Sequence, residues 1–277
     1  MGTYKIKNRR KKKAADASQQ SNLMMAAEEI GVIVNRVRSG AANILADPGS
    51  LQTQPAPGPP TGKLRALLAR VVKPSARPAR VSDSPRAWLY ALMSRCFALS
   101  DDITERMGTE VLACNKGCSW CCSLEVRVTA PEVFAITDYL RDTLSPEELQ
   151  GLRARLAELA PRAREASPMA RQRLRIRCPL LVDNRCSVYR VRPMACRGWN
   201  STDARACEVS YDSFYLKNVP FSVTMRDQIV AIGEGLSQGA KDAGLQGDKL
   251  ELISALHVAL ETHDVEAGWL AGERVFE

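Results

Sequence analysis

The spacing of apolar residues along the chain predicts a protein built mainly from α-helices. Apolar side chains recur every three or four positions over residues 87–99 and 223–243, which places them on one face of a helix. Helix-capping signals predict four further helices. Residues 129–132 begin a helix that ends at about Leu140, and residues 145–148 begin one that ends at about Leu159. Ser167-Pro168 begins a short helix, and residues 248–251 precede a helix at 252–260.

Two short stretches interrupt this helical pattern. Residues 180–182 and 187–189 are β-prone and flank Asp183-Asn184, a pair that favours a tight hairpin turn. Residues 124–128 alternate apolar and charged side chains and are expected to be extended. We therefore expect a mainly α fold, a helical domain with a small β-hairpin in the cysteine-rich part of the chain.

Composition divides the chain into an arm and a domain. Residues 1–83 form a basic, Pro- and Ala-rich arm that we expect to be largely disordered, with one amphipathic helix at 23–46; the ordered domain is expected over 84–277. Residues 1–86 carry 16 Lys and Arg against 5 Asp and Glu, whereas the rest carries 23 against 26. The arm thus either is a solvated tail or contacts an anionic partner, a nucleic acid or a lipid surface.

Eight of the nine cysteines fall into two sets of four, separated by a predicted helical insert. The ninth, Cys96, lies on the apolar stripe of the helix at 87–99 and is expected to be a core residue. The eight candidate metal ligands are Cys114, Cys118, Cys121 and Cys122 in the first set and Cys178, Cys186, Cys196 and Cys207 in the second.

Such a cysteine pattern predicts a thiolate metal site closed by two distant segments. Thiolates suit Zn²⁺ in tetrahedral coordination or iron, including the irons of an Fe–S cluster, and Cys118 and Cys121 have the usual half-site spacing. The vicinal pair Cys121-Cys122 is unusual, because adjacent side chains rarely reach one ion together; the second thiol would serve another ion, bridge or remain reactive. Independent core thiols and a vicinal disulfide switch are the competing interpretations.

Several residues near the cysteines have expected supporting roles. Arginines at 175, 177, 192 and 197 would favour deprotonated thiols and offset the charge of a thiolate centre, or else cover the surface or bind an anion. Trp120, Trp199 and Tyr189 would shield the site from water. His257 is expected in the core and His263 at the surface, so neither is assigned as a ligand.

The sequence also excludes several classes of protein. It contains no apolar run long enough to span a membrane and no apolar segment behind the basic N-terminus to suggest secretion, and its odd number of clustered cysteines favours the reducing cytoplasm. No Ser/His/Asp order, Gly-rich phosphate loop or paired His motif supports an ordinary hydrolase or a nucleotide-binding protein.

Three ordered motifs in the cysteine region resemble a known family. They are Cys114-x3-Cys118-x2-Cys121-Cys122, then Cys178-Pro179-x-Leu181 with Cys186-Ser187-Val188-Tyr189, then Arg192-Pro193-x-x-Cys196-Arg197. This pattern is similar to that of the YkgJ-type CxxCxxCC cysteine-cluster family, described as zinc- or iron-chelating domains. The resemblance implies chelation by Cys118, Cys121, Cys122, Cys178, Cys186 and Cys196, with Cys114 and Cys207 fitting the wider pattern.

We therefore expect a metal-binding protein in which zinc or iron has a structural or redox role. One alternative is an enzyme that uses the cluster for thiol chemistry or group transfer. A related cluster occurs in flagellin lysine methylases, although no S-adenosylmethionine-binding pattern is evident here. This alternative predicts a pocket lined by Arg197, Asn200 and Ser201. A second alternative is a metal chaperone or interaction module that binds its metal weakly.

Overall fold

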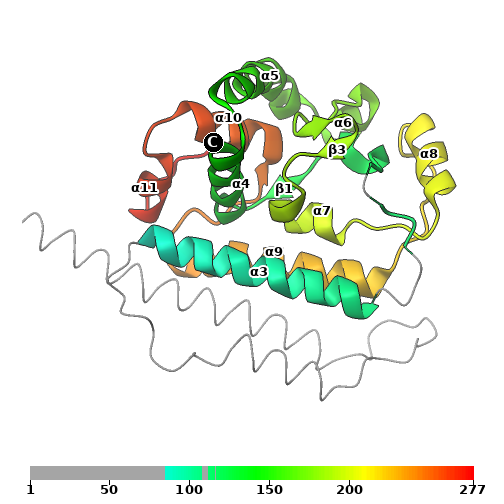
Figure 1. Cartoon of the computed structure of the whole chain (residues 1–277), viewed down its shortest axis with the longest axis horizontal. Helices are drawn as coiled ribbons and strands as arrows, with labels where there is room; N and C mark the ends of the chain where they lie inside the picture. The colour runs from blue at the N-terminus through cyan, green and yellow to red at the C-terminus, as the bar shows by residue number, and fades with distance from the viewer. Residues whose placement is uncertain (1–84, 108–111, 116) are drawn as a thin grey trace, which may run out of the picture.

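The computed structural model describes residues 85–107, 112–115 and 117–277, and this part of the chain is mainly helical, as the sequence predicts (Figure 1). The arm at 1–83, including its predicted helix at 23–46, lies outside the described residues. No helix among these residues is long and apolar enough to cross a membrane. The α-helices are α3 (Pro85–Met107), α4 (Ala130–Thr143), α5 (Pro146–Glu165), α6 (Pro168–Leu174), α7 (Met194–Gly198), α8 (Ala204–Asp212), α9 (Val223–Asp242), α10 (Leu252–Glu261) and α11 (Val265–Leu270).

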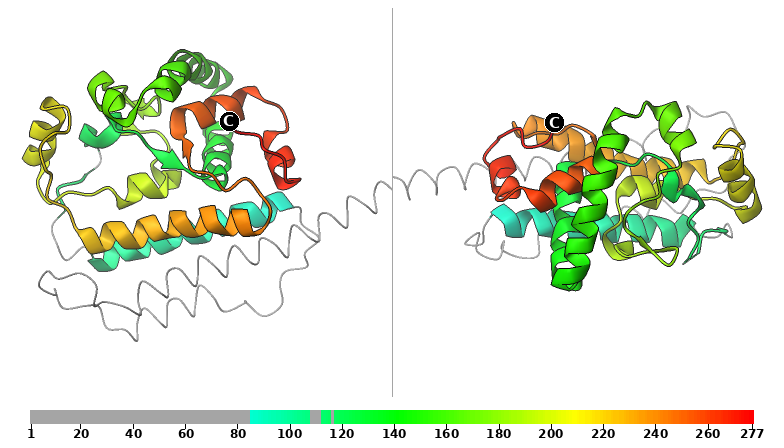
Figure 2. Two further views of the ribbon diagram at one scale, coloured as in Figure 1. Left: turned by 180° about the vertical axis from the view of Figure 1, so that it is seen from behind. Right: turned by 90° about the horizontal axis from the view of Figure 1, so that it is seen from above.

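The longer helices pack together, and the shorter segments that carry the two cysteine sets lie beside them. Helices α3 and α9 lie side by side along one edge, and α7 packs on α9 (Figures 1 and 2). Helix α10 packs against α4 and α5. In Figure 1, α8 lies at the opposite end of the molecule from α11. The helical core therefore supports a less regular region that contains the cysteines.

Three of the four predicted helix caps are confirmed. The Glu132 carboxylate accepts the backbone N–H of Thr129 at 2.7 Å before α4, and the Glu148 carboxylate accepts that of Ser145 at 2.8 Å before α5. The Ser167 hydroxyl accepts an N–H in the first turn of α6. In each case a polar side chain pairs with a backbone group that the helix end leaves free.

The fourth predicted cap, at 248–251, is wrong. Strand β4 (Leu250–Glu251) pairs antiparallel with β1 (Arg127–Val128), so these residues are extended rather than part of a capping box that begins at Asp248. Glu251 is itself the cap of α10, because its carboxylate accepts the N–H of Ser254 at 2.8 Å. The predicted extended piece at 124–128 is confirmed where β1 forms this ladder.

The predicted hairpin is present, but its second strand lies earlier than expected. Strands β2 (Leu181–Val182) and β3 (Arg185–Cys186) are joined by Asp183 and Asn184, whose φ angles of 50° and 61° fit a two-residue type I′ turn. This tight turn pairs Leu181 with Cys186. The expected strand at 187–189 is therefore wrong, and the chain instead forms the 3₁₀ turn η3 (Tyr189–Val191).

The exposure of the remaining cysteine and of the two histidines can be compared with the predictions. Cys96 is only 2% exposed and belongs to the hydrophobic core, as predicted, and burial raises the pKa of its thiol to about 12. His257 is half-buried on α10, whereas His263 is exposed, as expected for a surface residue.

Candidate metal centre

The two cysteine sets come from separate parts of the fold. In the first set, Cys114 and Cys118 lie in irregular chain, and Cys121 and Cys122 lie in the 3₁₀ turn η2 (Trp120–Ser123). In the second set, Cys178 precedes β2, Cys186 ends β3, Cys196 lies in α7, and Cys207 lies in α8. Asp203 caps α8, so Cys207 is helical. All eight are free thiols.

Hydrogen bonds join the two segments directly. The backbone N–H of Cys178 donates to the carbonyl oxygen of Cys122 at 2.8 Å, so the first residue of the second set lies against the last residue of the first. The Arg177 guanidinium donates to the Asn184 side-chain oxygen at 2.6 Å and to the Ser119 hydroxyl at 3.3 Å. The tip of the hairpin is thereby held against the first cysteine set.

Four thiols form what we call the inner group: Cys122, Cys178, Cys186 and Cys196. They come from η2, the segment before β2, β3 and α7, yet they lie close enough to influence one another's ionisation. Burial raises the pKa of Cys178 to about 12 and those of Cys186 and Cys196 above their usual value, and the neighbouring thiols add to each shift. In the absence of a cation these three thiols therefore remain protonated at neutral pH.

Backbone donors already point at two of these sulfur atoms. The N–H of Leu180 donates to the Cys178 sulfur, and the N–H of Val188 donates to the Cys186 sulfur. Each donor favours the thiolate but lowers the thiol pKa by less than burial raises it. Hydrogen bonds of this kind orient ligands and stabilise their negative charge once the proton has left.

The vicinal pair joins the inner group to the other thiols. Cys121 and Cys122 are hydrogen-bonded to each other, which raises the pKa of Cys121. This hydrogen bond and the positive charges of Arg177 and Arg192 together lower the pKa of Cys122 to about 7, against the opposing effect of burial. The expectation that arginines favour deprotonated thiols thus holds for Arg177 and Arg192 at Cys122.

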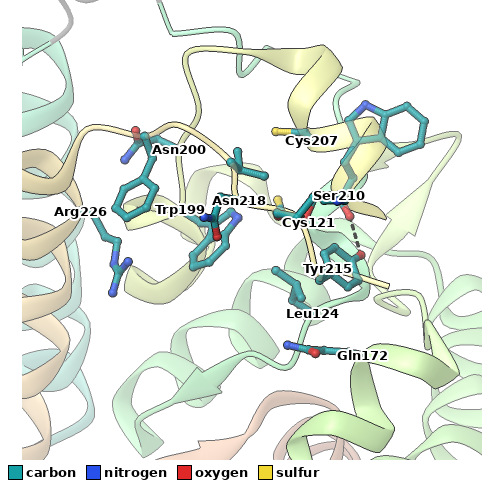
Figure 3. Close-up of a pocket in the computed structure, with 14 residues that line it drawn as sticks. Cys121, Leu124, Gln172, Trp199, Asn200, Cys207, Ser210, Tyr215, Asn218 and Arg226 are labelled. Atoms are coloured by element: carbon teal, nitrogen blue, oxygen red, sulfur yellow. Dashed lines mark hydrogen bonds between the residues drawn. The ribbon is translucent and has the colours of Figure 1, made fainter. Parts of the chain in front are cut away.

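We call the remaining thiols the outer group: Cys114, Cys118, Cys121 and Cys207. The Cys114 thiol lies 3.9 Å from the carbonyl oxygen of Ser201, and the N–H of Ala113 donates to the same oxygen at 2.8 Å. Burial raises the pKa of Cys114, and Cys118 and Cys207 are close enough to add to that rise. Cys121 and Cys207 line the same cavity (Figure 3).

The donor chemistry of the inner group fits zinc or iron. It supplies four soft sulfur ligands, two of them with backbone N–H donors. Within the described residues, no three Cys, His, Asp or Glu side chains are already arranged to hold an ion together. Burial raises the pKa of three of these thiols, so their convergence on an ion would accompany the loss of their protons.

One buried carboxylate positions the helix that carries Cys196. Glu132 is 1% exposed, and besides capping α4 it accepts the N–H of Met194, the first residue of α7, at 2.7 Å. Its other oxygen accepts both the N–H and the hydroxyl of Thr129. Glu132 thus accepts three hydrogen bonds and ties α4 to α7.

Changing Glu132 to glutamine is expected to destabilise the domain by about 2 kcal/mol, because one accepting oxygen becomes an NH₂ group that faces a buried donor. The matched control is Glu148→Gln, which alters the same capping position on α5 at an exposed site and is expected to cost less than about 0.5 kcal/mol. Urea unfolding of both variants measures the difference. Equal losses would show that the contact with Met194 carries no extra stability.

The pocket expected for an enzyme at Arg197, Asn200 and Ser201 is not found in that form. Arg197 is buried, and its guanidinium donates to the Arg192 carbonyl and the Ser100 hydroxyl, each at 2.9 Å, while also pairing with Asp101. It therefore joins α7 to α3. The Ser201 hydroxyl is buried against the Asp203 backbone, and Asn200 lines a cavity to which Arg197 and Ser201 do not contribute.

The aromatic residues expected to shield the cysteines do so only in part. Trp120 is half-buried and packs against Tyr211, with ring centroids 5.5 Å apart. Trp199 is 44% exposed and Tyr189 49% exposed, so the shielding role of these two stays a prediction. Arg175 also differs from expectation, because it stacks on Tyr211 and donates to the carbonyls at the end of α8.

Comparison with known proteins identifies the cysteine region. Residues 113–212 match the model of the CxxCxxCC family, whose description is "Putative zinc- or iron-chelating domain". The match includes all eight cysteines of the inner and outer groups and leaves out Cys96. No curated protein and no solved structure matches the chain. The resemblance seen in the sequence is confirmed over this range, and it supports metal binding as the general activity.

Proposed function

We propose that this CxxCxxCC segment binds zinc or iron through its eight cysteines, with the inner and outer groups each supplying four thiolates. The observation that carries the proposal is the inner group itself, in which four separate segments place partly buried thiols together. The vicinal pair then needs no special geometry, because Cys122 serves one group and Cys121 the other. This division answers the difficulty that adjacent side chains rarely reach the same ion.

Buried thiols account for the need for a cation. Ionised sulfurs at Cys178, Cys186 and Cys196 would be destabilised by their poor solvation and by neighbouring sulfurs of the group. A bound zinc or iron ion would supply the positive charge that allows the protons to leave. Arg177 and Arg192 supply part of that charge in advance at Cys122.

Support for a structural role comes from how few backbone hydrogen bonds join these segments. The hairpin ladder contains only two residues from each strand, and a single backbone bond connects Cys178 to Cys122. An ion held by the inner group would cross-link η2, the hairpin and α7, so binding free energy would become folding free energy. The proposal also requires a reducing compartment such as the cytoplasm, because disulfide formation would remove the ligands.

Metal analysis of two serine variants tests the division into two groups. Cys186→Ser is expected to remove the metal of the inner group and Cys207→Ser that of the outer group, each leaving about half of the wild-type metal content, while the double variant retains none. Cys96→Ala is the control and should keep all the metal, since Cys96 belongs to neither group. Circular dichroism verifies folding, and Cys118→Ser replaces Cys207→Ser if α8 unfolds. Loss of all metal in either single variant would contradict two independent groups.

A further inference from the structure

A cavity of about 280 Å³ adjoins the outer thiol group (Figure 3). Its walls come from η2, the chain after α7, helix α8, the loop at 215–221 and the first turn of α9. Cys121 and Cys207 lie along this cavity, whereas Arg226 lies well away from them on its other side (Figure 3). The cavity therefore extends beyond the outer thiols, and its walls include side chains that the proposed metal binding does not use.

The walls of this cavity are rich in aromatic side chains. Trp120, Trp199, Tyr215 and Phe221 all line it, in a chain whose aromatic content is only 5%. The rings of Trp199 and Phe221 lie nearly parallel, with centroids 6.5 Å apart and an angle of 15° between their planes. Such surfaces favour a ligand with a flat aromatic body, which can stack against them.

The charged groups at the cavity are all positive. Arg226 and Lys217 line it and no Asp or Glu does, and within the described residues neither cation forms an ion pair. The Arg226 guanidinium lies over Phe221 at 5.0 Å and over Trp199 at 5.8 Å. An anionic group on the ligand would therefore meet a cation that is already held beside the aromatic wall.

Hydrogen bonds fix this part of the cavity before a ligand arrives. The buried Asn200 side chain donates to the Gly198 carbonyl at 3.0 Å and accepts the N–H of Ser222 at 2.8 Å. Since Trp199 precedes Asn200 and Phe221 precedes Ser222, the bond between Asn200 and Ser222 sets the two rings relative to each other. Because these side chains are already held in place, less conformational entropy is lost when a ligand binds.

We propose that this cavity binds a small planar aromatic anion, with its ring against Trp199 and Phe221 and its anionic group at Arg226. The volume is near the lower end of the range for small-molecule pockets, which suits a one- or two-ring compound. The amides of Gln172 and Asn218 at the cavity supply further hydrogen-bonding groups. This binding requires no metal, so it stands apart from the proposed function of the cysteines.

Isothermal titration of the purified full chain with 2-naphthoate and with its neutral analogue 2-naphthamide tests the proposal. Naphthoate is expected to bind with a Kd below about 1 mM and about ten-fold more tightly than the amide, because only the carboxylate forms a charge-assisted bond with Arg226. Arg226→Gln should weaken naphthoate binding about ten-fold and abolish the preference over the amide. Arg205→Gln is the matched control, since Arg205 is exposed on α8, pairs with Glu208 and does not line the cavity.

Three results would overturn the proposal: no naphthoate binding at about 1 mM, equal affinity for acid and amide, or full affinity in Arg226→Gln. Thermal melts establish that each variant is folded, and Phe221→Leu, which keeps the cation and removes the ring, provides a second test with the same expected loss. Metal content is measured on the same samples. A metal-free protein that still binds naphthoate would refute the metal proposal alone, and a metal-bound protein that does not bind it would refute this one alone.

Discussion

Replacing Cys178 with serine is expected to remove about half of the bound metal and to lower the melting temperature of the domain by about 10 °C or more. Serine is a poor ligand for the metals that thiolates prefer, and structural zinc contributes about 10–16 kcal/mol of folding free energy in zinc-finger peptides. Cys178 also donates its backbone N–H to Cys122, so this residue lies where the two cysteine segments meet. Elemental analysis and thermal melts measure the two effects.

A chelator separates the loss of metal from the loss of a buried side chain. Wild-type protein treated with chelator should melt near the melting temperature of untreated Cys178→Ser. The chelator should lower the melting temperature of Cys178→Ser by less than it lowers that of the wild type. Cys96→Ser makes the same chemical change at a buried thiol outside both groups, and it should lower stability while keeping the full metal content. Full metal content in Cys178→Ser would remove Cys178 from the inner group.

Gly247→Ala is expected to destabilise the domain by about 3 kcal/mol, because the loop before β4 passes very close to α9. A Cβ atom at Gly247 would lie 2.3 Å from the carbonyl oxygen of Ser237 and 2.9 Å from the backbone nitrogen of Lys241. These are backbone atoms, which cannot rotate away as the end of a side chain can. The Ser237 hydroxyl also donates to the Gly247 carbonyl at 2.5 Å, so any displacement breaks a buried hydrogen bond.

The matched control for this loop is Gly151→Ala in the middle of α5. A Cβ there meets only the end of Arg155 at 3.7 Å, an ordinary contact, and alanine is the better helix former by about 0.5–1 kcal/mol. Gly247→Ala should therefore lower the urea concentration at the midpoint of unfolding, and Gly151→Ala should raise it. Stability unchanged by Gly247→Ala would mean that the loop can move away from α9 without loss.

Local signals in the sequence identify much of the fold. Polar caps at Thr129, Ser145 and Ser167 satisfy backbone groups within a few residues, so the starts of three helices can be predicted without knowing what lies nearby. The apolar stripe of α3 likewise identifies Cys96 as a core residue. Tertiary pairing explains the error at Glu251, because β4 forms only against β1, more than a hundred residues earlier.

The sequence indicates which thiols are candidate ligands but not how they are arranged. Cysteine spacing identifies all eight thiols, and the family match covers the same residues. Spacing gives no sign of the proposed division of Cys121 and Cys122 between two groups, because that division depends on where the hairpin and α7 meet η2. Glu132 was predicted as a cap, yet its bond to Met194 joins residues 62 positions apart and leaves no local signal. The aromatic cavity also escaped prediction, since α8 and α9 bring its walls together.

The most direct test of the account is the metal and acid-labile sulfide content of the full chain purified without oxygen, together with its visible spectrum. Two groups of four thiolates predict either about two zinc ions per chain in colourless protein or iron with sulfide in brown protein. Stoichiometric metal in either form would establish the cysteine groups as metal centres. Protein that is folded, fully reduced and free of both metals would contradict the account.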